Sequence, residues 1–482
     1  MSFSSITYLI FFGIVCLFMT ATNVFKSKLG LEKTQTVRHA FLLGMSYVFY
    51  GWWDWRFCFL MLALTAVAYF TAVAVAKRKK YEKAALFGGI AVPLIILGIF
   101  KYFNFFIESF ADAFGITSMH TLSIILPVGI SFYTFQSLSY TIDVSRGKLE
   151  PQKNFLKLAL YISFFPQLVA GPIVKAGDFI PQLEEDRSIT LKNLEKGLQI
   201  FLVGMFKKVV IADNISVFAD EVFRTPKAFS GMTVLLGVIA YSVQIYFDFA
   251  GYSDMAIGSA KCIGFDINRN FNIPYISRNV SEFWKRWHIS LSTWLMEYLY
   301  IPLGGNRKGR VRTYINLMIT MLLGGLWHGA SWTFVAWGLF HGIGLCVHKL
   351  YLSARHFDKN RKGNPVSNVI STFLTYIFVC IGWVFFRADT FETAWNVFKA
   401  IFTMQDGISH PFSWAFVGIA AVAAEMLIAA VSSRKSSLAR VEVSYPALPL
   451  DRVWGLTLFA LLTFVTLGLA YTGSNPFIYF RF

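Results

Sequence analysis

Long apolar runs, separated by short polar stretches, dominate the chain from end to end. When a run of about 17–25 residues is taken as one membrane crossing, the pattern predicts helices near residues 4–20, 38–52, 56–76, 84–101, 123–142, 155–174, 197–216, 230–252, 312–327, 330–350, 366–386, 412–432 and 453–472. Several segments are short or interrupted by Gly and Pro, and such segments can be re-entrant where protein surrounds their backbone. The pattern therefore predicts an all-α, polytopic membrane protein with roughly 11–13 transmembrane or re-entrant helices.

Composition supports a membrane protein and excludes other classes. Hydrophobic residues make up 56% of the 482 residues and charged residues only 15%, against about 25% charged in an ordinary globular protein. Soluble enzymes, fibrous repeats and disordered chains are excluded on this basis. The first apolar run, residues 6–19, has no Lys or Arg ahead of it, which favours a retained first helix over a cleaved signal peptide.

The basic residues lie in short runs between the apolar segments, and they give the chain a net charge of +17. This placement is typical of cytoplasmic loops and their contact with anionic lipid, not of nucleic-acid binding. We expect the cytoplasmic loops at residues 24–38, 77–83, 146–157, 306–312, 349–362 and 434–440. The loop from Tyr102 to His120 has no Lys or Arg and carries two acidic residues, so it is expected outside. The C-terminal tail Asn475–Phe482 is expected outside as well.

Two histidines are the strongest candidates for chemistry. His288 lies in a central stretch, Gly251–Trp337, that is too polar to span lipid, and His328 lies between two apolar runs with almost no loop. An ionisable group at membrane depth is costly and is a candidate functional residue, although His328 can also simply hydrogen-bond a neighbouring helix. A lone imidazole can act as a general base toward a hydroxyl, and glycines at 324, 325 and 329 are expected to let a substrate approach the backbone.

Other catalytic and metal-binding motifs are missing from the sequence. No HExxH, GxSxG or Walker loop occurs, and the five cysteines form no CxxC pair or Cys/His cluster. We therefore expect no metal. Asp248, Tyr252 and Asp254 are interpreted as polar packing, with an acid pair for general acid–base work as the alternative.

Six ordered motifs resemble the membrane-bound O-acyltransferase (MBOAT) family, in particular its bacterial branch of alginate-type polysaccharide O-acetyltransferases. They are Leu126–Gln136, Phe165–Ile173, Tyr246–Asp254, Asn272–Tyr275, Phe283–Ser292 and Leu326–Trp332. The resemblance runs from about Trp52 to the C-terminus. It implies an MBOAT-type helical bundle around a central tunnel. It also implies one integral-membrane domain over residues 1–482, with N-terminal helices (1–120), a catalytic core (121–350), C-terminal helices (351–474) and an extracytoplasmic tail (475–482).

The resemblance also implies roles for single residues. His328 matches the family's catalytic histidine and His288 its second signature histidine, which orients or binds the donor. The tail Phe477–Phe482 is similar to an F-x-Y-F-x-F motif of polysaccharide-acylating relatives, which makes Tyr479 a candidate acyl relay. Without the resemblance, Tyr479 reads as an interfacial aromatic residue.

The activity implied is transfer of acetyl from cytoplasmic acetyl-CoA, a substrate, to an extracytoplasmic polysaccharide. The resemblance also implies a secreted or membrane-anchored transferase partner. It implies a location in the bacterial inner membrane as well. Lys285 and Arg286 are candidate donor contacts. The basic group at 307–312 can also meet CoA phosphates, but the distribution of positive charge explains that group without them.

Two other functions stay open at this stage. A polytopic transporter or flippase, for a polysaccharide precursor or an acyl donor, would place His328 in a proton or substrate path. A scaffold that only anchors a secreted acetylating partner would not need His328 for transfer.

Overall fold

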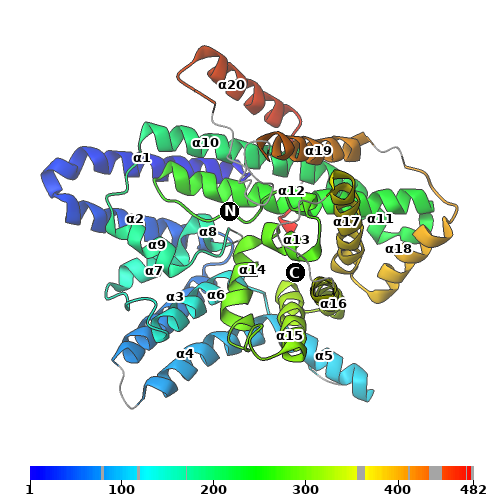
Figure 1. The fold of residues 1–482 in the computed structure, drawn as a ribbon. Helices are drawn as coiled ribbons and strands as arrows, with labels where there is room; N and C mark the ends of the chain where they lie inside the picture. Colours follow the sequence, from blue (N-terminus) through cyan, green and yellow to red (C-terminus); the bar gives the residue numbers. More distant parts are fainter. Residues whose placement is uncertain are drawn as a thin grey trace. The chain divides into compact units, whose positions relative to one another are not determined.

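The computed structural model describes residues 1–77, 81–116, 120–169, 171–354, 364–410, 413–433, 448–473 and 475–478. Helices form almost all of the regular structure (Figure 1), and within these ranges no β-strand is present beyond an isolated bridge between Phe229 and Ile408. The all-α prediction is confirmed.

The helical segments have the following bounds. They are α1 (Ile6–Leu29), α2 (Leu31–Gly51), α3 (Arg56–Ala76), α4 (Glu82–Leu97), η1 (Gly98–Tyr102), α5 (Phe103–Phe114), α6 (Ile130–Ser145), α7 (Phe155–Ser163), α8 (Phe165–Leu168), α9 (Ala176–Glu184), α10 (Leu191–Met205), η2 (Phe206–Ala212), α11 (Asp213–Arg224), η3 (Pro226–Ala228), α12 (Gly231–Cys262), η4 (Pro274–Ile276), α13 (Val280–Arg286), α14 (Ile289–Leu295), η5 (Met296–Tyr300), α15 (Arg310–His328), α16 (Trp332–Ala354), α17 (Pro365–Arg387), α18 (Phe391–Thr403), α19 (Ser413–Ser433) and α20 (Val453–Gly468).

Local sequence signals explain where many of these helices begin. The side chain of Ser5 accepts a hydrogen bond from the Tyr8 amide at the start of α1, and Asn279 caps α13 in the same way through the Glu282 amide. The helix α17 begins with Asn364 as its cap and Pro365 in its first turn. Polar caps satisfy amides that the first turn leaves without a helical partner, and proline is suited to the first turn because it has no amide to leave unsatisfied.

Two of the segments expected to be helical are interrupted, so their bounds differ from the predicted ones. The segment expected at 123–142 becomes helical only at Ile130, because Pro127 disfavours helix before it and Gly129 has a positive φ of 76°. A Cβ at Gly129 would lie 2.8 Å from the Leu168 carbonyl oxygen. The segment expected at 155–174 breaks at Phe164, whose ψ of 111° is not helical.

The Tyr102–His120 stretch was expected to be a loop, and this was wrong. Residues 103–114 form α5, which continues α4 through the π-helical turn η1. The stretch is rich in phenylalanine and has a strongly one-sided apolar face, and that pattern stabilises a helix even beside acidic residues.

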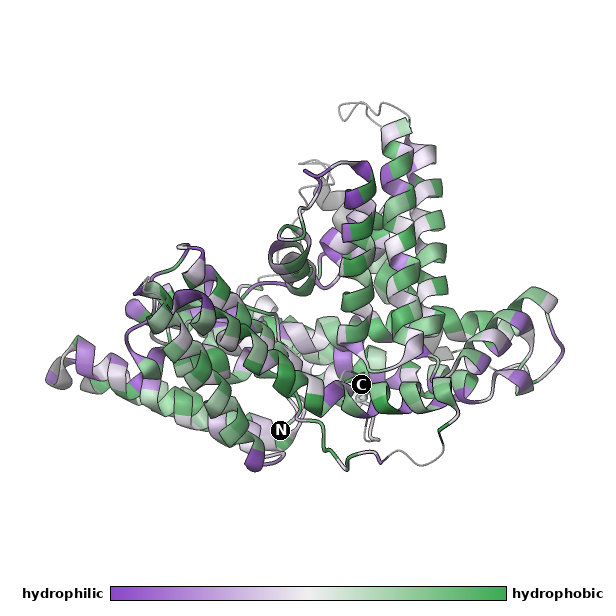
Figure 2. Cartoon of the chain, turned by 90° about the horizontal axis from the view of Figure 1, so that it is seen from below, coloured by the Kyte–Doolittle hydropathy of each residue, from purple (hydrophilic) through white to green (hydrophobic). Residues whose placement is uncertain are grey.

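Five helices among the described residues are long and apolar enough to cross a membrane. They are Ile6–Val24, Arg56–Ala76, Glu82–Phe114, Gly231–Cys262 and Pro365–Arg387. Large hydrophobic side chains are exposed on such helices, for example Phe70 at 66% and Phe373 at 61%. Hydrophobic residues run along most of the helices (Figure 2). Surfaces of this kind are unfavourable in water and favourable in lipid, so the chain is a multi-pass membrane protein.

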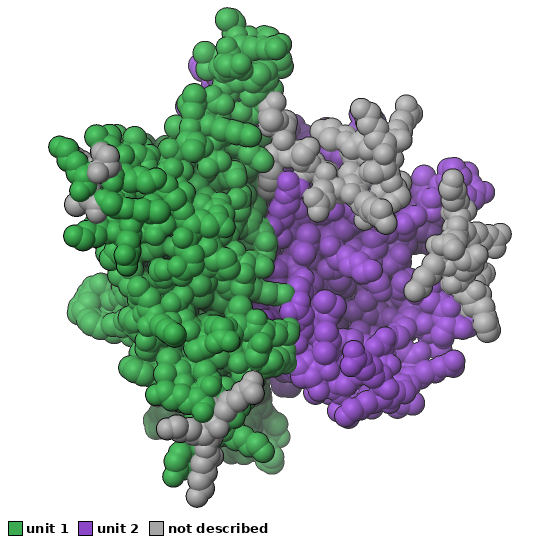
Figure 3. Space-filling model, turned by 60° about the vertical axis from the view of Figure 1, so that its left-hand side comes forward, with its two compact units in different colours: residues 1–203, 252–268, 447–459 green, residues 204–251, 269–446, 460–482 purple. Residues whose placement is uncertain are grey.

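The chain forms two compact units (Figure 3). The first unit comprises residues 1–203, 252–268 and 447–459, and the second comprises residues 204–251, 269–446 and 460–482. In the first unit, α3 packs on α4 and α6, and α2 packs on α1 and α7. Its interior is aromatic around Tyr8, whose hydroxyl donates a 2.6 Å hydrogen bond to Ser259.

The second unit contains both candidate histidines. Its main feature is a helical hairpin in which α15 packs along α16, which in turn packs on α17. The short helix α13 contacts α16, and α14 continues into η5, which contacts α15. These contacts bring residues 280–300, which include His288, against the hairpin.

Candidate active site

Glycines set the close packing of the hairpin that carries His328. A Cβ at Gly325 would lie 2.3 Å from the Phe334 carbonyl oxygen, and one at Gly338 would lie 2.4 Å from the Met321 carbonyl oxygen. A Cβ at Gly329 would overlap the Phe334 ring at 2.2 Å. Small residues of this kind let membrane helices approach closely. The expectation that the glycines at 324, 325 and 329 let a substrate approach the backbone was wrong for Gly325, because α16 fills that space. Gly329 differs, because it also lines a cavity.

His328 is the last residue of α15 and is only 2% exposed. Aromatic rings surround its imidazole. The ring centroid of Trp337 lies 5.0 Å away, that of Trp327 5.1 Å away and that of Phe386 5.2 Å away, all in edge-to-face arrangements. The imidazole is thus held in a fixed orientation by rigid side chains from α15, α16 and α17.

His288 lies between α13 and α14 and is fully buried. Its φ of 43° is left-handed, which is uncommon for a residue with a side chain. The next two residues anchor this turn, because the Ile289 amide donates to the Asn270 carbonyl (2.9 Å) and the Ser290 hydroxyl donates to the Asn270 side chain (2.6 Å). Backbone strain held in place by its surroundings is common at functional sites.

The structure brings the two histidines together although forty residues separate them in sequence. Their ring centroids are 6.2 Å apart, and Trp327 contacts both rings. Among the described residues no group of three His, Cys, Asp or Glu side chains is placed to hold a metal ion.

A third histidine, His341, was missed by the sequence analysis. It is fully buried on α16, and its ring centroid lies 4.9 Å from that of Trp337, which also contacts His328. Within the described ranges, neither of its ring nitrogens has a hydrogen-bond partner. The spacing of Phe334, Trp337 and His341 places all three on one helix face, and this spacing was the signal available in the sequence.

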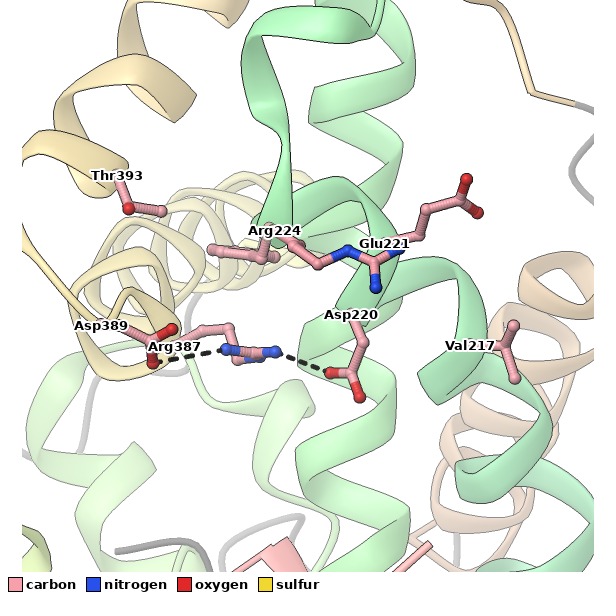
Figure 4. A pocket seen from close by; sticks show the side chains of 8 residues that line it. Val217, Asp220, Glu221, Arg224, Arg387, Asp389 and Thr393 are labelled. Atoms are coloured by element: carbon pink, nitrogen blue, oxygen red, sulfur yellow. Dashed lines mark hydrogen bonds and ion pairs between the residues drawn. The ribbon is translucent and has the colours of Figure 1, made fainter. Parts of the chain in front are cut away.

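A cavity of about 520 Å³ adjoins His328 in the second unit. Its lining comes from the α15–α16 turn, the end of α17 and the C-terminal tail: Gly329, Ala330, Ser331, Thr333, Phe334, Phe386, Arg387, Ala388, Asp389 and Ile478. A neighbouring cavity of about 460 Å³ shares Arg387 and Asp389 with it. Figure 4 shows Arg387 in this second cavity between Asp220 (2.9 Å) and Asp389 (3.9 Å).

Two residues of the C-terminal tail are buried in the same unit. Phe477 and Ile478 are 3% and 4% exposed. The Phe477 ring lies 5.7 Å from Phe249, whose ring lies 4.7 Å from His288. The candidate relay residue Tyr479 lies outside the described residues.

The two candidate donor contacts differ in their surroundings. Lys285 is exposed, whereas Arg286 is buried. The Arg286 guanidinium lies 3.1 Å from Glu282 and donates a 3.1 Å hydrogen bond to the Asn272 carbonyl. Arg286 therefore ties α13 to the segment before it. Asp248, expected to be polar packing, forms a buried ion pair with Lys208.

The fold and the site together define a polytopic helical membrane protein with paired, buried histidines at the end of a helical hairpin. The chain belongs to the MBOAT, membrane-bound O-acyltransferase, family, whose model matches residues 149–386 and so includes both histidines. The protein is therefore a membrane acyltransferase, as the motifs implied.

Three curated relatives support this assignment. The chain is 43% identical to the probable alginate O-acetylase AlgI of Azotobacter vinelandii over 376 residues, which is 77% of this chain and 73% of the relative. It is 38% identical to the peptidoglycan O-acetyltransferase of Helicobacter pylori over 391 residues, 75% of this chain and 73% of the relative. It is 27% identical to the teichoic acid D-alanyltransferase of Bacillus subtilis over 278 residues, which is 55% of this chain and 69% of the relative. An O-acyltransferase is consistent with all three.

Proposed function

We propose that this protein is a bacterial inner-membrane O-acetyltransferase that takes acetyl from cytoplasmic acetyl-CoA for transfer to an extracytoplasmic polysaccharide. The observation that carries the proposal is the meeting, within one unit, of His328, His288 and the buried tail that leads to Tyr479. Names of the relatives, which include acetyltransferases of alginate and of peptidoglycan, favour acetyl as the group and a polysaccharide as the acceptor.

His328 is the proposed general base for the first transfer. Its imidazole takes the phenolic proton of Tyr479 as the phenolic oxygen attacks the thioester carbonyl of acetyl-CoA. The carbon–sulfur bond breaks, and the CoA thiolate leaves and receives the proton from the imidazolium. The products are acetyl-tyrosine and CoA. In a second transfer, an acceptor hydroxyl attacks the acetyl-tyrosine ester and restores the phenol.

Each substrate enters from the side where it occurs. Acetyl-CoA carries phosphates and cannot cross lipid, so its acetyl group must meet the acceptor chain within the protein. Lys285, which is exposed, is the proposed direct contact to the CoA phosphates, and Arg286 orients the helix that carries it. The tail is proposed to face the extracytoplasmic side, where a secreted or membrane-anchored partner passes acetyl to the polymer.

The test is peptide mass spectrometry after incubating the purified protein with acetyl-CoA. We expect an acetyl group on the Phe477–Phe482 peptide in the wild type and none in His328→Ala. Tyr479→Phe should also remain unlabelled while inserting normally into the membrane. CoA release without tail labelling would reject the relay and retain the enzyme. Normal turnover in His328→Ala would remove this residue from the mechanism and favour a scaffold, and acetyl-CoA-independent transport in proteoliposomes would favour a transporter.

A further inference from the structure

A buried cluster of charge in the second unit is not part of the histidine site. Lys208 Nζ lies 2.6 Å from Asp213 Oδ1 and 2.5 Å from Asp248 Oδ1, and the three side chains are 3%, 9% and 5% exposed. One cation and two carboxylates have a formal sum of −1. Buried charges are tolerated when further hydrogen bonds satisfy them, so the second carboxylate requires donors from another segment.

The C-terminal tail provides those donors. The Ile478 amide donates to Asp248 Oδ2 at 2.8 Å, and the Asn475 side-chain amide donates to Asp213 Oδ1 at 3.1 Å. Lys208 Nζ in turn donates to the Asn475 carbonyl at 3.3 Å. The same Asn475 amide donates to the Ser216 hydroxyl at 2.7 Å. The cluster therefore contacts the tail at two points three residues apart.

These contacts are suited to fixing the position of the chain. The hydrogen bond at residue 478 is donated by the backbone amide, so it does not depend on the side chain of Ile478. It fixes the backbone directly before residue 479. Asp248 is followed by Phe249, the residue that contacts both Phe477 and His288. The anchored amide belongs to Ile478, the residue directly before 479. Since one residue of extended chain spans only about 3.3 Å, the anchor lies close to the start of residue 479 along the chain.

We propose that Lys208, Asp213 and Asp248 form a binding site for the tail segment Asn475–Ile478 and act as positioning residues for acyl transfer to Tyr479. The proposal rests on the proposed function, because it gives the bound tail the task of presenting the acceptor hydroxyl. A purely structural role would instead use the cluster only to join α11 and α12, and the tail would contribute nothing to catalysis.

Two variants of the full-length protein test the site from its two sides. Asn475→Ala removes the side-chain contacts from the tail without altering the helices. Asp248→Asn leaves a single acceptor oxygen, which cannot serve both the Ile478 amide and the Lys208 ion pair. The matched control is Lys207→Met, which removes the neighbouring lysine and its 3.1 Å ion pair with Glu425 on α19.

Two readouts are measured on each variant: deuterium uptake by the 475–482 peptide, and the initial rate at which acetyl-CoA labels that peptide. We expect faster uptake in both test variants, with the α15 and α16 peptides unchanged. Labelling should slow by about tenfold to a hundredfold, since a misplacement of about 1 Å costs up to about a hundredfold. Lys207→Met should match the wild type in both readouts.

The outcomes separate this inference from the proposed function. Unchanged uptake in both test variants would overturn the binding site, whatever the labelling. Faster uptake with a wild-type labelling rate would overturn the positioning role. If the wild type releases CoA but never labels its tail, the relay and the positioning role both fail, and uptake alone then decides whether the cluster binds the tail.

Discussion

Gly325→Ala tests whether the close contact between α15 and α16 sets the position of His328. The added Cβ would lie 2.3 Å from the Phe334 carbonyl oxygen and 3.1 Å from Gly338 Cα. Both neighbours are backbone atoms, so neither can rotate away. An ordinary contact is about 3.5 Å, and the two helices must therefore separate by about 1 Å near the end that carries His328.

The size of the effect follows from this displacement. A shift of about 1 Å in a catalytic group can cost about a hundredfold in rate, and overpacking costs about 1–3 kcal/mol of stability. Replacing a helical Gly by Ala increases stability by about 1 kcal/mol, because Ala has the higher helix propensity. We therefore expect Gly325→Ala to fold, with thermal stability lowered by about 2 kcal/mol or less, and to lose about a hundredfold in CoA release.

Gly324→Ala is the matched control, because it makes the same chemical change one residue earlier. Its Cβ would lie 3.2 Å from Leu295 Cδ1, the far end of a flexible side chain. We expect the rate of CoA release to stay within about twofold of wild type, with stability equal or slightly higher. Wild-type turnover by Gly325→Ala, or equal losses in the two variants, would refute the reasoning.

Two further predictions separate roles within the central stretch. Lys285→Gln should raise KM for acetyl-CoA without lowering stability, whereas Arg286→Gln should lower thermal stability by about 1–3 kcal/mol, because Glu282 and the Asn272 carbonyl lose a buried donor. Steady-state kinetics and thermal unfolding in detergent measure both, and a reversed pattern would assign the donor contact to Arg286. At the left-handed turn, His288→Val should be less stable than His288→Asn by about 1–3 kcal/mol, since asparagine tolerates φ near 43° and valine does not. Equal melting temperatures would contradict this account of the backbone.

The length of the apolar runs predicted most helices, because the thickness of the bilayer sets how long a membrane-crossing helix must be. It failed where a short backbone signal interrupted an apolar run. Pro127 and Gly129 delay α6, and their effect depends on a contact with the Leu168 carbonyl that is distant in sequence. It also failed at residues 103–114, which were taken as part of a loop between two apolar runs although the phenylalanines favour a helix.

For the candidate site, the sequence pointed to two histidines that lie together in the structure, but not to the residues that surround them. His288 and His328 were identified from their unusual sequence context, and the structure brings them within 6.2 Å. The aromatic residues around them were not identified, since Trp and Phe are so frequent in this chain that no single one stands out. The role of Gly325 was misjudged for a related reason: a glycine indicates that something approaches closely, and only the structure shows that α16 is what approaches.

The anchored tail changes what is required of the proposed relay. A free acceptor must find the site by diffusion, whereas a tethered and oriented group reaches a high effective concentration, worth up to about 7–11 kcal/mol of the barrier. The tail is held at Asn475 and Ile478, and Tyr479 follows directly in the sequence. Ile478 also lines the cavity beside His328. Under the proposed function, the segment that carries Tyr479 is therefore joined directly to a residue that is both anchored and part of that cavity.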